Sequence, residues 1–439
     1  MDIDTNGRRR VGVAMLILAL AATSVVLLIG YNVKDLCTRH QWDGYQYRTL
    51  CYNDVFALYT FRGLDLQPFP YIHGDGVFDN EHRPDGSTVE AGDLEYPVLT
   101  GVFIGIVAEV THNGVQFFRV TSVALAVMAL LSVILLWNLT RDKRRLFYFA
   151  AAPALALYAF HNWDLLAVLF LCLGLWSFSR RLDGLAGVLL GLGAAAKVFP
   201  GLIVPALVLA RRREGKPSGR IVVTAVTSFI AVNVPFVIID RAGWWAPWHF
   251  QSLRFPNFET SWYNVYRHLA THFGNFWASS YPGLTSYASA GLFVIAIALL
   301  LWRESKRAQF RPYAASFGIL LIWLLTAKVY SPQYALWLLP LFVLVEIPLA
   351  GFIAFGVSDF LVWVTVSRFF LAFPPNQGGI GAGSLSTMTT LLEVTVWARY
   401  AVLLWLLWLS RRADENVIEQ PVAQATPASM QAAPVEFPA

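Results

Sequence analysis

Acidic and basic side chains between the apolar runs are the residues of this chain best suited to chemistry. Asp54 lies in "CYNDVFALYTFRG", where the pattern predicts a short helix that begins close to it. A partly desolvated carboxylate at a membrane face can accept a proton from an incoming hydroxyl group. Alternatively, Asn53 or Asp54 caps this helix by accepting hydrogen bonds from its free backbone N–H groups. The sequence leaves both roles of Asp54 open.

Two further carboxylates are candidates for a second acidic residue in the site. Glu95 in "LEYPVLTG" opens a short apolar helix at membrane depth, where a carboxylate is costly unless it is used or paired. Asp164 in "HNWDLLAVLF" enters a helix after a predicted outer turn. Asp164 is therefore either a helix cap or a polar group that faces a cavity.

Two lysines lie at the predicted outer ends of membrane spans, where the positive-inside bias disfavours them. They are Lys197 in "GLGAAAKVFPG" and Lys328 in "LTAKVYSPQY". Cations at this depth can bind a phosphate at headgroup level, and Arg254 and Arg267 could add to such a site. The alternative is that each long side chain extends to the interface without a ligand. For the pair together we favour the phosphate site.

An aromatic-rich segment near residues 240–285 offers groups that could contact a sugar. Aromatic faces stack on sugar C–H surfaces, although Trp and Tyr also form the ordinary belt at a membrane interface. Within "SWYN" we select Trp262, Tyr263 and Asn264 as candidate contacts to the acceptor or the sugar.

Cys37 and Cys51 both fall in the polar segment after the first apolar run. If this segment faces an oxidising compartment, the two cysteines could form a disulfide, and two free thiols are the alternative. His73 and His82 lie among carboxylates in the same segment, but their spacing matches no metal motif. We therefore expect no metal and no other cofactor.

The composition defines the class of protein that must position these residues. Of 439 residues, 56% are hydrophobic and only 14% are charged, and the mean hydropathy is +0.53. These values predict a polytopic membrane protein. The net charge of +5 comes from short basic clusters between apolar runs, which is typical of cytoplasmic loops. We therefore expect membrane lipids as surroundings and no nucleic acid as a partner.

The basic clusters fix the predicted topology, because all of them should face the cytoplasm. Threading helices between them gives about twelve spans, with both termini inside. The segment 95–110 is too short to cross and is assigned to the first outer loop as a juxtamembrane or re-entrant helix. Residues 1–412 then form one integral membrane domain, with external loops near 32–115, 240–285 and 373–393. Residues 413–439 lack periodicity and are predicted to be a disordered cytoplasmic tail.

Four fragments together resemble the glycosyltransferase family 87 membrane proteins of actinobacteria. They are "CYNDVFALYTFRGL", "LEYPVLTG", "AAAKVFPGLIVP" and "YSPQYALWLLP", and they look similar to polyprenyl-phosphate-mannose-dependent alpha-mannosyltransferases. The resemblance implies an all-α GT-C-like bundle with juxtamembrane helices in its first external loop. It also implies that Asp54 is the essential acidic residue, that the donor phosphate lies near Lys197 and Lys328, and that "YSPQY" adds Tyr330 and Gln333 as sugar contacts.

The function that follows from this resemblance is inverting sugar transfer at the outer face of a bacterial plasma membrane. A sugar, expected to be mannose, passes from a polyprenyl-phosphate donor to a glycolipid or polysaccharide acceptor. Asp54 deprotonates the acceptor hydroxyl, and Lys or Arg side chains stabilise the leaving phosphate. The alternatives are a lipid-linked sugar transporter or flippase, and a non-catalytic membrane protein for envelope assembly.

Overall fold

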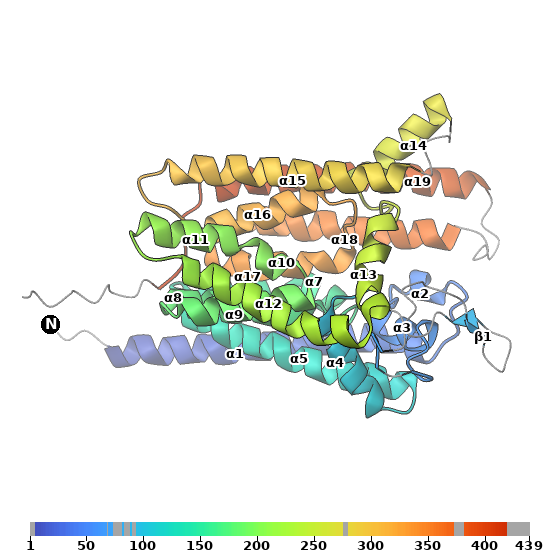
Figure 1. The fold of residues 1–439 in the computed structure, drawn as a ribbon, viewed down its shortest axis with the longest axis horizontal. Helices are drawn as coiled ribbons and strands as arrows, with labels where there is room; N and C mark the ends of the chain where they lie inside the picture. The colour runs from blue at the N-terminus through green and yellow to red at the C-terminus, as the bar shows by residue number, and fades with distance from the viewer. Residues whose placement is uncertain are drawn as a thin grey trace, which may run out of the picture.

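The computed structural model describes residues 5–67, 69–72, 81–82, 88–89, 94–274, 280–372 and 382–418. Helices dominate these residues, and the chain is an all-α polytopic membrane protein (Figure 1). The two short strands β1 (Glu81–His82) and β2 (Thr88–Val89) pair antiparallel in the first outer segment. The helices are α1 (Thr5–Asp35), α2 (Tyr45–Arg48), α3 (Asp54–Phe61), α4 (Val98–Glu109), α5 (Gly114–Leu139), α6 (Phe147–Ala150), α7 (Pro153–Tyr158), α8 (Asp164–Ser179), α9 (Asp183–Ala196), α10 (Phe199–Leu202), α11 (Val204–Arg213), α12 (Gly219–Ile239), α13 (Arg241–Leu253), α14 (Ser261–Phe273), α15 (Tyr281–Ser305), α16 (Pro312–Thr326), α17 (Ala335–Leu344), α18 (Leu349–Ala372) and α19 (Ala382–Ser410), with 3₁₀ turns η1 (Leu36–Thr38), η2 (Lys143–Leu146) and η4 (Pro332–Tyr334).

Six helices of the described chain are long and apolar enough to cross a membrane, since about 20 apolar residues are needed. They correspond to α1, α5, α12, α15, α18 and α19. Shorter apolar helices, including α8, α9, α16 and α17, pack between them (Figure 1). Each predicted span coincides with one helix or with two consecutive short helices. The number of twelve spans itself stays a prediction.

The basic clusters gather at one end of the bundle, as the charge pattern predicts. Arg211, at the end of α11, pairs with Asp183 at the start of α9. The side chain of Arg213 donates to the backbone carbonyl of Arg307, and that of Arg307 donates to the carbonyl of Arg411. The loops that carry these arginines are therefore joined to one another at the same end.

The prediction of a disordered tail is wrong for residues 413–418, and residues 419–439 lie outside the described chain. Val417 and Glu415 form isolated β-bridges with Thr140 and Val345, and Glu415 accepts hydrogen bonds from two backbone N–H groups at the start of α16. The tail is ordered here because it satisfies helix ends that would otherwise lack partners.

Two predicted external loops are more helical than expected. The segment 240–285 contains α13 and α14, and the segment 373–393 includes the start of α19. The first loop carries α2, α3 and α4, in agreement with the predicted juxtamembrane helices. Thr100 of α4 donates to the carbonyl of Ala196 at the end of α9, at 2.7 Å, and α5 begins five residues after α4 ends. The helix α4 therefore stays at this end of the bundle and does not cross it.

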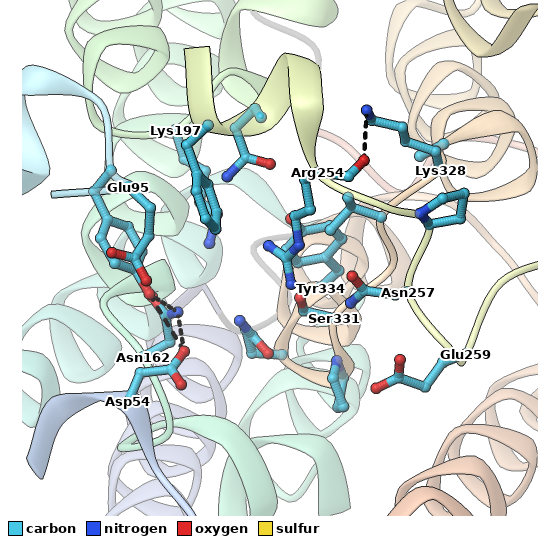
Figure 2. Close-up of a pocket in the computed structure, with 18 of the residues that line it drawn as sticks. Asp54, Glu95, Asn162, Lys197, Arg254, Asn257, Glu259, Lys328, Ser331 and Tyr334 are labelled. Atoms are coloured by element: carbon cyan, nitrogen blue, oxygen red, sulfur yellow. Dashed lines mark hydrogen bonds between the residues drawn. The ribbon is translucent and has the colours of Figure 1, made fainter. Parts of the chain in front are cut away.

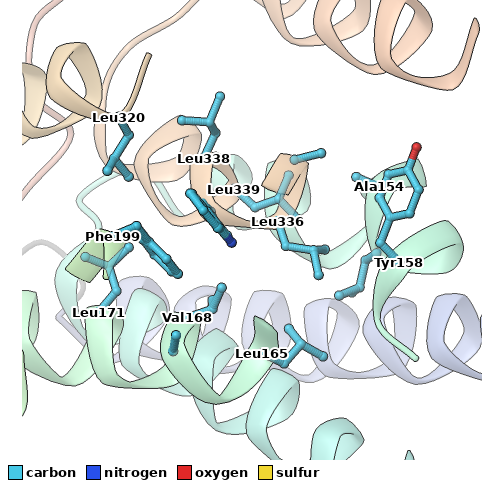
Figure 3. Packing of buried hydrophobic residues seen from close by; sticks show 14 of the residues in the cluster. Ala154, Tyr158, Leu165, Val168, Leu171, Phe199, Leu320, Leu336, Leu338 and Leu339 are labelled. Atoms are coloured by element: carbon cyan, nitrogen blue, oxygen red, sulfur yellow. The ribbon is translucent and has the colours of Figure 1, made fainter. Parts of the chain in front are cut away.

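The core lies around α8, α16 and α17. Leu165, Val168 and Leu171 of α8 face leucines of α17 (Figure 3). Phe199 of α10 stacks on Trp337 of α17 with ring centroids 4.3 Å apart. All ten residues of α17 are buried, and a helix that is apolar on every side is suited to a position inside the bundle.

Candidate active site

A cavity of about 810 Å³ opens at the end of the bundle that carries α2, α3 and α13. Its polar lining comes from segments far apart in the sequence: the start of α3, the turns before α4 and α8, the end of α9, the α13–α14 connection and η4. Figure 2 shows these side chains converging on one space. A cavity with a few convergent polar and charged groups is the usual form of a small-molecule site.

Asp54 lies in this cavity as the first residue of α3, and it is not the helix cap. Asn53 is the cap, because its side-chain oxygen accepts a hydrogen bond from the N–H of Phe56 at 2.8 Å. The backbone N–H of Asp54 donates to the carbonyl of His161 at 2.7 Å, which docks α3 against the turn before α8. The carboxylate of Asp54 is thereby free of a capping role and borders the cavity.

Asn162 and Tyr96 hold the carboxylate of Asp54. The amide of Asn162 donates to Oδ2 of Asp54 at 2.8 Å and to the hydroxyl oxygen of Tyr96 at 2.7 Å, and the Tyr96 hydroxyl lies 3.3 Å from the same Oδ2 (Figure 2). Burial raises the pKa of Asp54, and the hydrogen bond from Asn162 opposes that shift. A desolvated carboxylate with a raised pKa is a stronger base than an exposed one.

Lys197 borders the same cavity and is held by Asp164. Its ammonium lies 2.8 Å from Oδ2 of Asp164, whose other oxygen accepts the indole N–H of Trp337. The ammonium also lies over the rings of Tyr96 and Tyr334, 5.7 and 5.1 Å from their centroids. Asp164 is fully buried and does not line the cavity, and its carboxylate contacts the ammonium of Lys197.

Lys328 and Arg254 also border the cavity, but their charged groups are placed differently. The ammonium of Lys328 is within hydrogen-bond distance of the carbonyls of Ser252 and Arg254, at 3.0 and 2.8 Å, and of the Ser286 hydroxyl at 2.6 Å. Desolvation lowers the pKa of Lys328 to about 8. Its three N–H donors are therefore used to hold the end of α13. The guanidinium of Arg254 extends into the cavity (Figure 2).

Glu95 lines the cavity, but it is paired. Its Oε2 accepts from Nε of Arg62 at 2.8 Å, and both side chains are largely buried. This ion pair joins the end of α3 to the segment before α4. The ion pair with Arg62 explains how the carboxylate of Glu95 is tolerated at this depth. The charge of Asp54 near Asn162 is less neutralised than that of Glu95.

Five predicted site residues lie away from the cavity: Arg267, Trp262, Tyr263, Asn264 and Tyr330. The first four are on α14, at the outer edge of the molecule (Figure 1). Arg267 pairs with Glu393 of α19. The indole of Trp262 donates to the carbonyl of Thr326, and Tyr263 packs on Phe258. The side chain of Asn264 is buried. Tyr330 is buried against the guanidinium of Arg399, 3.7 Å from its ring centroid. Gln333, by contrast, does line the cavity.

Several lining residues were not predicted from the sequence, notably Tyr96, Asn162, Asn257, Glu259, Ser331 and Tyr334. Asn162 stands two residues before Asp164 in "HNWD", and of the two it is Asn162 that lines the cavity. Glu259 precedes the selected "SWYN" by two residues, with one Thr and one Ser nearby. No periodicity or spacing in the sequence indicates that Asn162 or Glu259, and not a polar neighbour, lines the cavity.

A disulfide joins Cys37, in η1, to Cys51, with the two Cα atoms 5.5 Å apart. It ties the end of α1 to the chain just before the cap of α3. The His73 side chain and the His82 side chain lie outside the described residues. Within the described chain, no cluster of three or more His, Cys, Asp or Glu residues has the geometry to hold a metal ion.

The fold and the site define an α-helical polytopic membrane protein with a buried carboxylate and cations around one cavity. Comparison with known families makes this specific. The model for glycosyltransferase family 87 matches residues 95–327, and the chain belongs to that family. It is therefore a membrane glycosyltransferase, with a lipid-linked sugar as donor. No curated protein matches the chain.

Proposed function

We propose that this enzyme transfers a hexose, with mannose the first candidate, from a polyprenyl-phosphate donor to a hydroxyl group of a glycolipid or polysaccharide acceptor, on the extracytoplasmic face of the plasma membrane. The observation that supports this most directly is the placement of Asp54. Its carboxylate borders the cavity and is oriented by Asn162 and Tyr96, with Lys197 lining the same cavity.

The reaction follows from these positions. Asp54 takes the proton of the acceptor hydroxyl as its oxygen attacks the anomeric carbon from the face opposite the phosphate, so the configuration at that carbon inverts. The polyprenyl phosphate leaves with its electron pair, and Lys197 and Arg254 stabilise its negative charge. A phosphodiester leaving group is a weak base, so no general acid is required, in contrast to glycosidases, which use two carboxylates.

The position of Lys328 changes the expected phosphate site. The sequence placed Lys197 and Lys328 together at the phosphate, whereas the ammonium of Lys328 is bound to carbonyls at the end of α13. We therefore assign the direct phosphate contacts to Lys197 and Arg254. Lys328 supports them because it holds the carbonyl of Arg254.

The test is transfer of radiolabelled mannose from polyprenyl-phosphate mannose into lipid and polysaccharide fractions. Membranes would carry the wild type, Asp54→Asn, or the control Asp43→Asn, which removes an exposed carboxylate from the same outer loop. Loss of the base should reduce transfer by about 10²- to 10⁴-fold, while the control keeps the wild-type rate. Equal transfer by Asp54→Asn and the wild type would refute the role of Asp54. Absence of transfer by the wild type would refute this donor and favour a transporter.

A further inference from the structure

Glu259 is a carboxylate on the cavity wall that the proposed chemistry leaves without a role. It lies in the connection between α13 and α14, is 6% exposed, and lines the cavity. Among the described residues, no hydrogen bond or ion pair joins its carboxylate to another side chain. Figure 2 shows this carboxylate on the side of the cavity opposite Asp54.

The backbone around Glu259 is firmly held, so the position of the side chain is built into the fold. The guanidinium of Arg399, itself fully buried in α19, donates to the backbone carbonyl of Glu259 at 2.7 Å. Two residues earlier, the N–H of Asn257 donates to the carbonyl of Lys328 at 3.0 Å. One residue later, the hydroxyl of Thr260 caps α14. The Glu259 carboxylate accepts a hydrogen bond from the backbone of its own residue and interacts electrostatically with Arg399 and Arg254. No other side chain of the described residues hydrogen-bonds it, which leaves acceptor positions for a ligand.

Gln333 provides a second unused acceptor on the same cavity. It lies in η4, is 3% exposed, and its side-chain oxygen is buried without a hydrogen-bond partner in the described chain. The oxygens of an ionised carboxylate and of an amide can only accept hydrogen bonds. The ligand that satisfies them must therefore supply donors, which sugar hydroxyls do and which a phosphodiester does not.

Glu259 gives one side of the cavity a negative charge, and Arg254 lies close enough to interact with it electrostatically. Lys197 and Arg254 favour a negatively charged group near them, whereas Glu259 repels one. In Figure 2, Ser331 and Tyr334 lie between the Asp54 side and Glu259. The cavity therefore has a cationic side at Lys197, suited to a phosphate, and an acidic side at Glu259, suited to an uncharged polyhydroxyl group.

We propose that Glu259 and Gln333 form a subsite for the hydroxyl groups of an uncharged sugar, and that Glu259 excludes sugars that carry a carboxylate or phosphate at this place. This inference rests on the proposed function and adds to it the class of substrate. The sugar in the subsite is either the hexose of the donor or the terminal sugar of the acceptor. Both supply the same hydroxyl groups, and kinetics distinguishes them.

The experiment measures binding by the purified full chain without requiring turnover. Ligand-dependent thermal stabilisation gives apparent Kd values for methyl α-mannoside, methyl β-glucuronide and undecaprenyl phosphate. The proteins are the wild type, Glu259→Gln and the control Glu109→Gln, which changes an exposed carboxylate at the end of α4. Gln333→Met tests the same subsite from η4 and carries the test if Glu259→Gln does not fold.

We expect the wild type and the control to prefer the mannoside over the glucuronide. Glu259→Gln should weaken mannoside binding about tenfold or more, because a hydrogen bond to a charged group is lost, and should reduce the preference against the glucuronide. Its affinity for undecaprenyl phosphate should stay within about twofold of the wild type. An unchanged mannoside affinity and preference, or an equal loss for all three ligands, would overturn the subsite.

Steady-state kinetics of mannose transfer then identifies the sugar. A rise in KM confined to the acceptor places the acceptor sugar against Glu259, and a rise confined to the donor places the donor hexose there. Either result supports the subsite, and no change in either KM contradicts it. If the wild type binds the ligands as expected but transfers no mannose, the proposed donor is wrong and the subsite stands.

Discussion

Replacement of Asp164 by Asn leaves the ammonium of Lys197, whose side chain is only 15% exposed, without the carboxylate that it contacts. The two charged atoms are 2.8 Å apart, and at an effective dielectric constant of about 20 their attraction is about 6 kcal/mol. Desolvation of both groups offsets much of this attraction. Removal of one partner from such a pair typically costs about 3–5 kcal/mol, because the remaining charge stays buried. The amide oxygen of Asn can still accept from Trp337, so the change isolates the charge.

The assay is a double-mutant cycle with Asp164→Asn, Lys197→Met and the double variant, measured as the free energy of unfolding in mixed micelles. Each single variant should be less stable than the wild type by about 3 kcal/mol or more. The double variant contains no unpaired charge, so it should recover at least about 2 kcal/mol of the summed losses. Since the double variant also lacks the cation assigned to the phosphate, it should be stable and still inactive in mannose transfer.

Two results would refute this reasoning. If the losses of the two single variants simply add in the double variant, Asp164 and Lys197 are not energetically coupled. If the double variant transfers mannose at the wild-type rate, Lys197 does not stabilise the leaving phosphate. The first result concerns the fold and the second concerns the chemistry, so the two conclusions are independent.

Three further predictions concern the surroundings of the cavity. Asn162→Ala removes a hydrogen bond that lowers the pKa of Asp54, so the pKa of Asp54 should rise. The acidic limb of the pH–rate profile should therefore move to higher pH, and an unmoved limb contradicts this role of Asn162. Replacement of Cys37 and Cys51 by Ser should reduce stability by about 3 kcal/mol, the value for a loop of similar length, and the wild type should lose the same amount when reduced. Lys328, with a pKa of about 8, loses its charge as the pH rises through that value. The KM for the donor should therefore rise above pH 8 in the wild type, because the neutral amine holds the carbonyl of Arg254 less strongly. Lys328→Met should show a raised KM that no longer depends on this ionisation.

The membrane class and the positions of the helices were predictable because they depend on local properties of the chain. Apolar length predicts a span, and clustered Lys and Arg predict the cytoplasmic side. The short segment 95–110 forms the 12-residue helix α4, as its limited apolar length predicts. The ordered residues 413–418 could not be predicted, since they are fixed by distant helix ends, such as those near Thr140 and Val345.

The candidate site was predictable only in part, because the role of a charged side chain depends on its partner. Arg267 and Arg254 look alike in the sequence, yet Arg267 meets Glu393, which is 126 residues away, and Arg254 faces the cavity. Asn53 and Asp54 differ by one position, and this difference decides which one caps α3. Lys328 was correctly placed at the cavity, but its partners are carbonyls of α13 that no motif indicates.

The assignment of Asp54 as the base depends on contacts between two parts of the chain. The region that matches the family, residues 95–327, contributes Asn162 and Lys197, while Asp54 and Gln333 lie outside it. The first outer segment is joined to the matched region through the backbone bond from Asp54 to His161 and the side-chain bond from Asn162. The segment around Asp54 is sufficient to select it as a candidate, but the residues that orient its carboxylate lie in another segment and cannot be identified from the first one alone. Family membership therefore supports the type of reaction, and the hydrogen bonds around Asp54 support its place in that reaction.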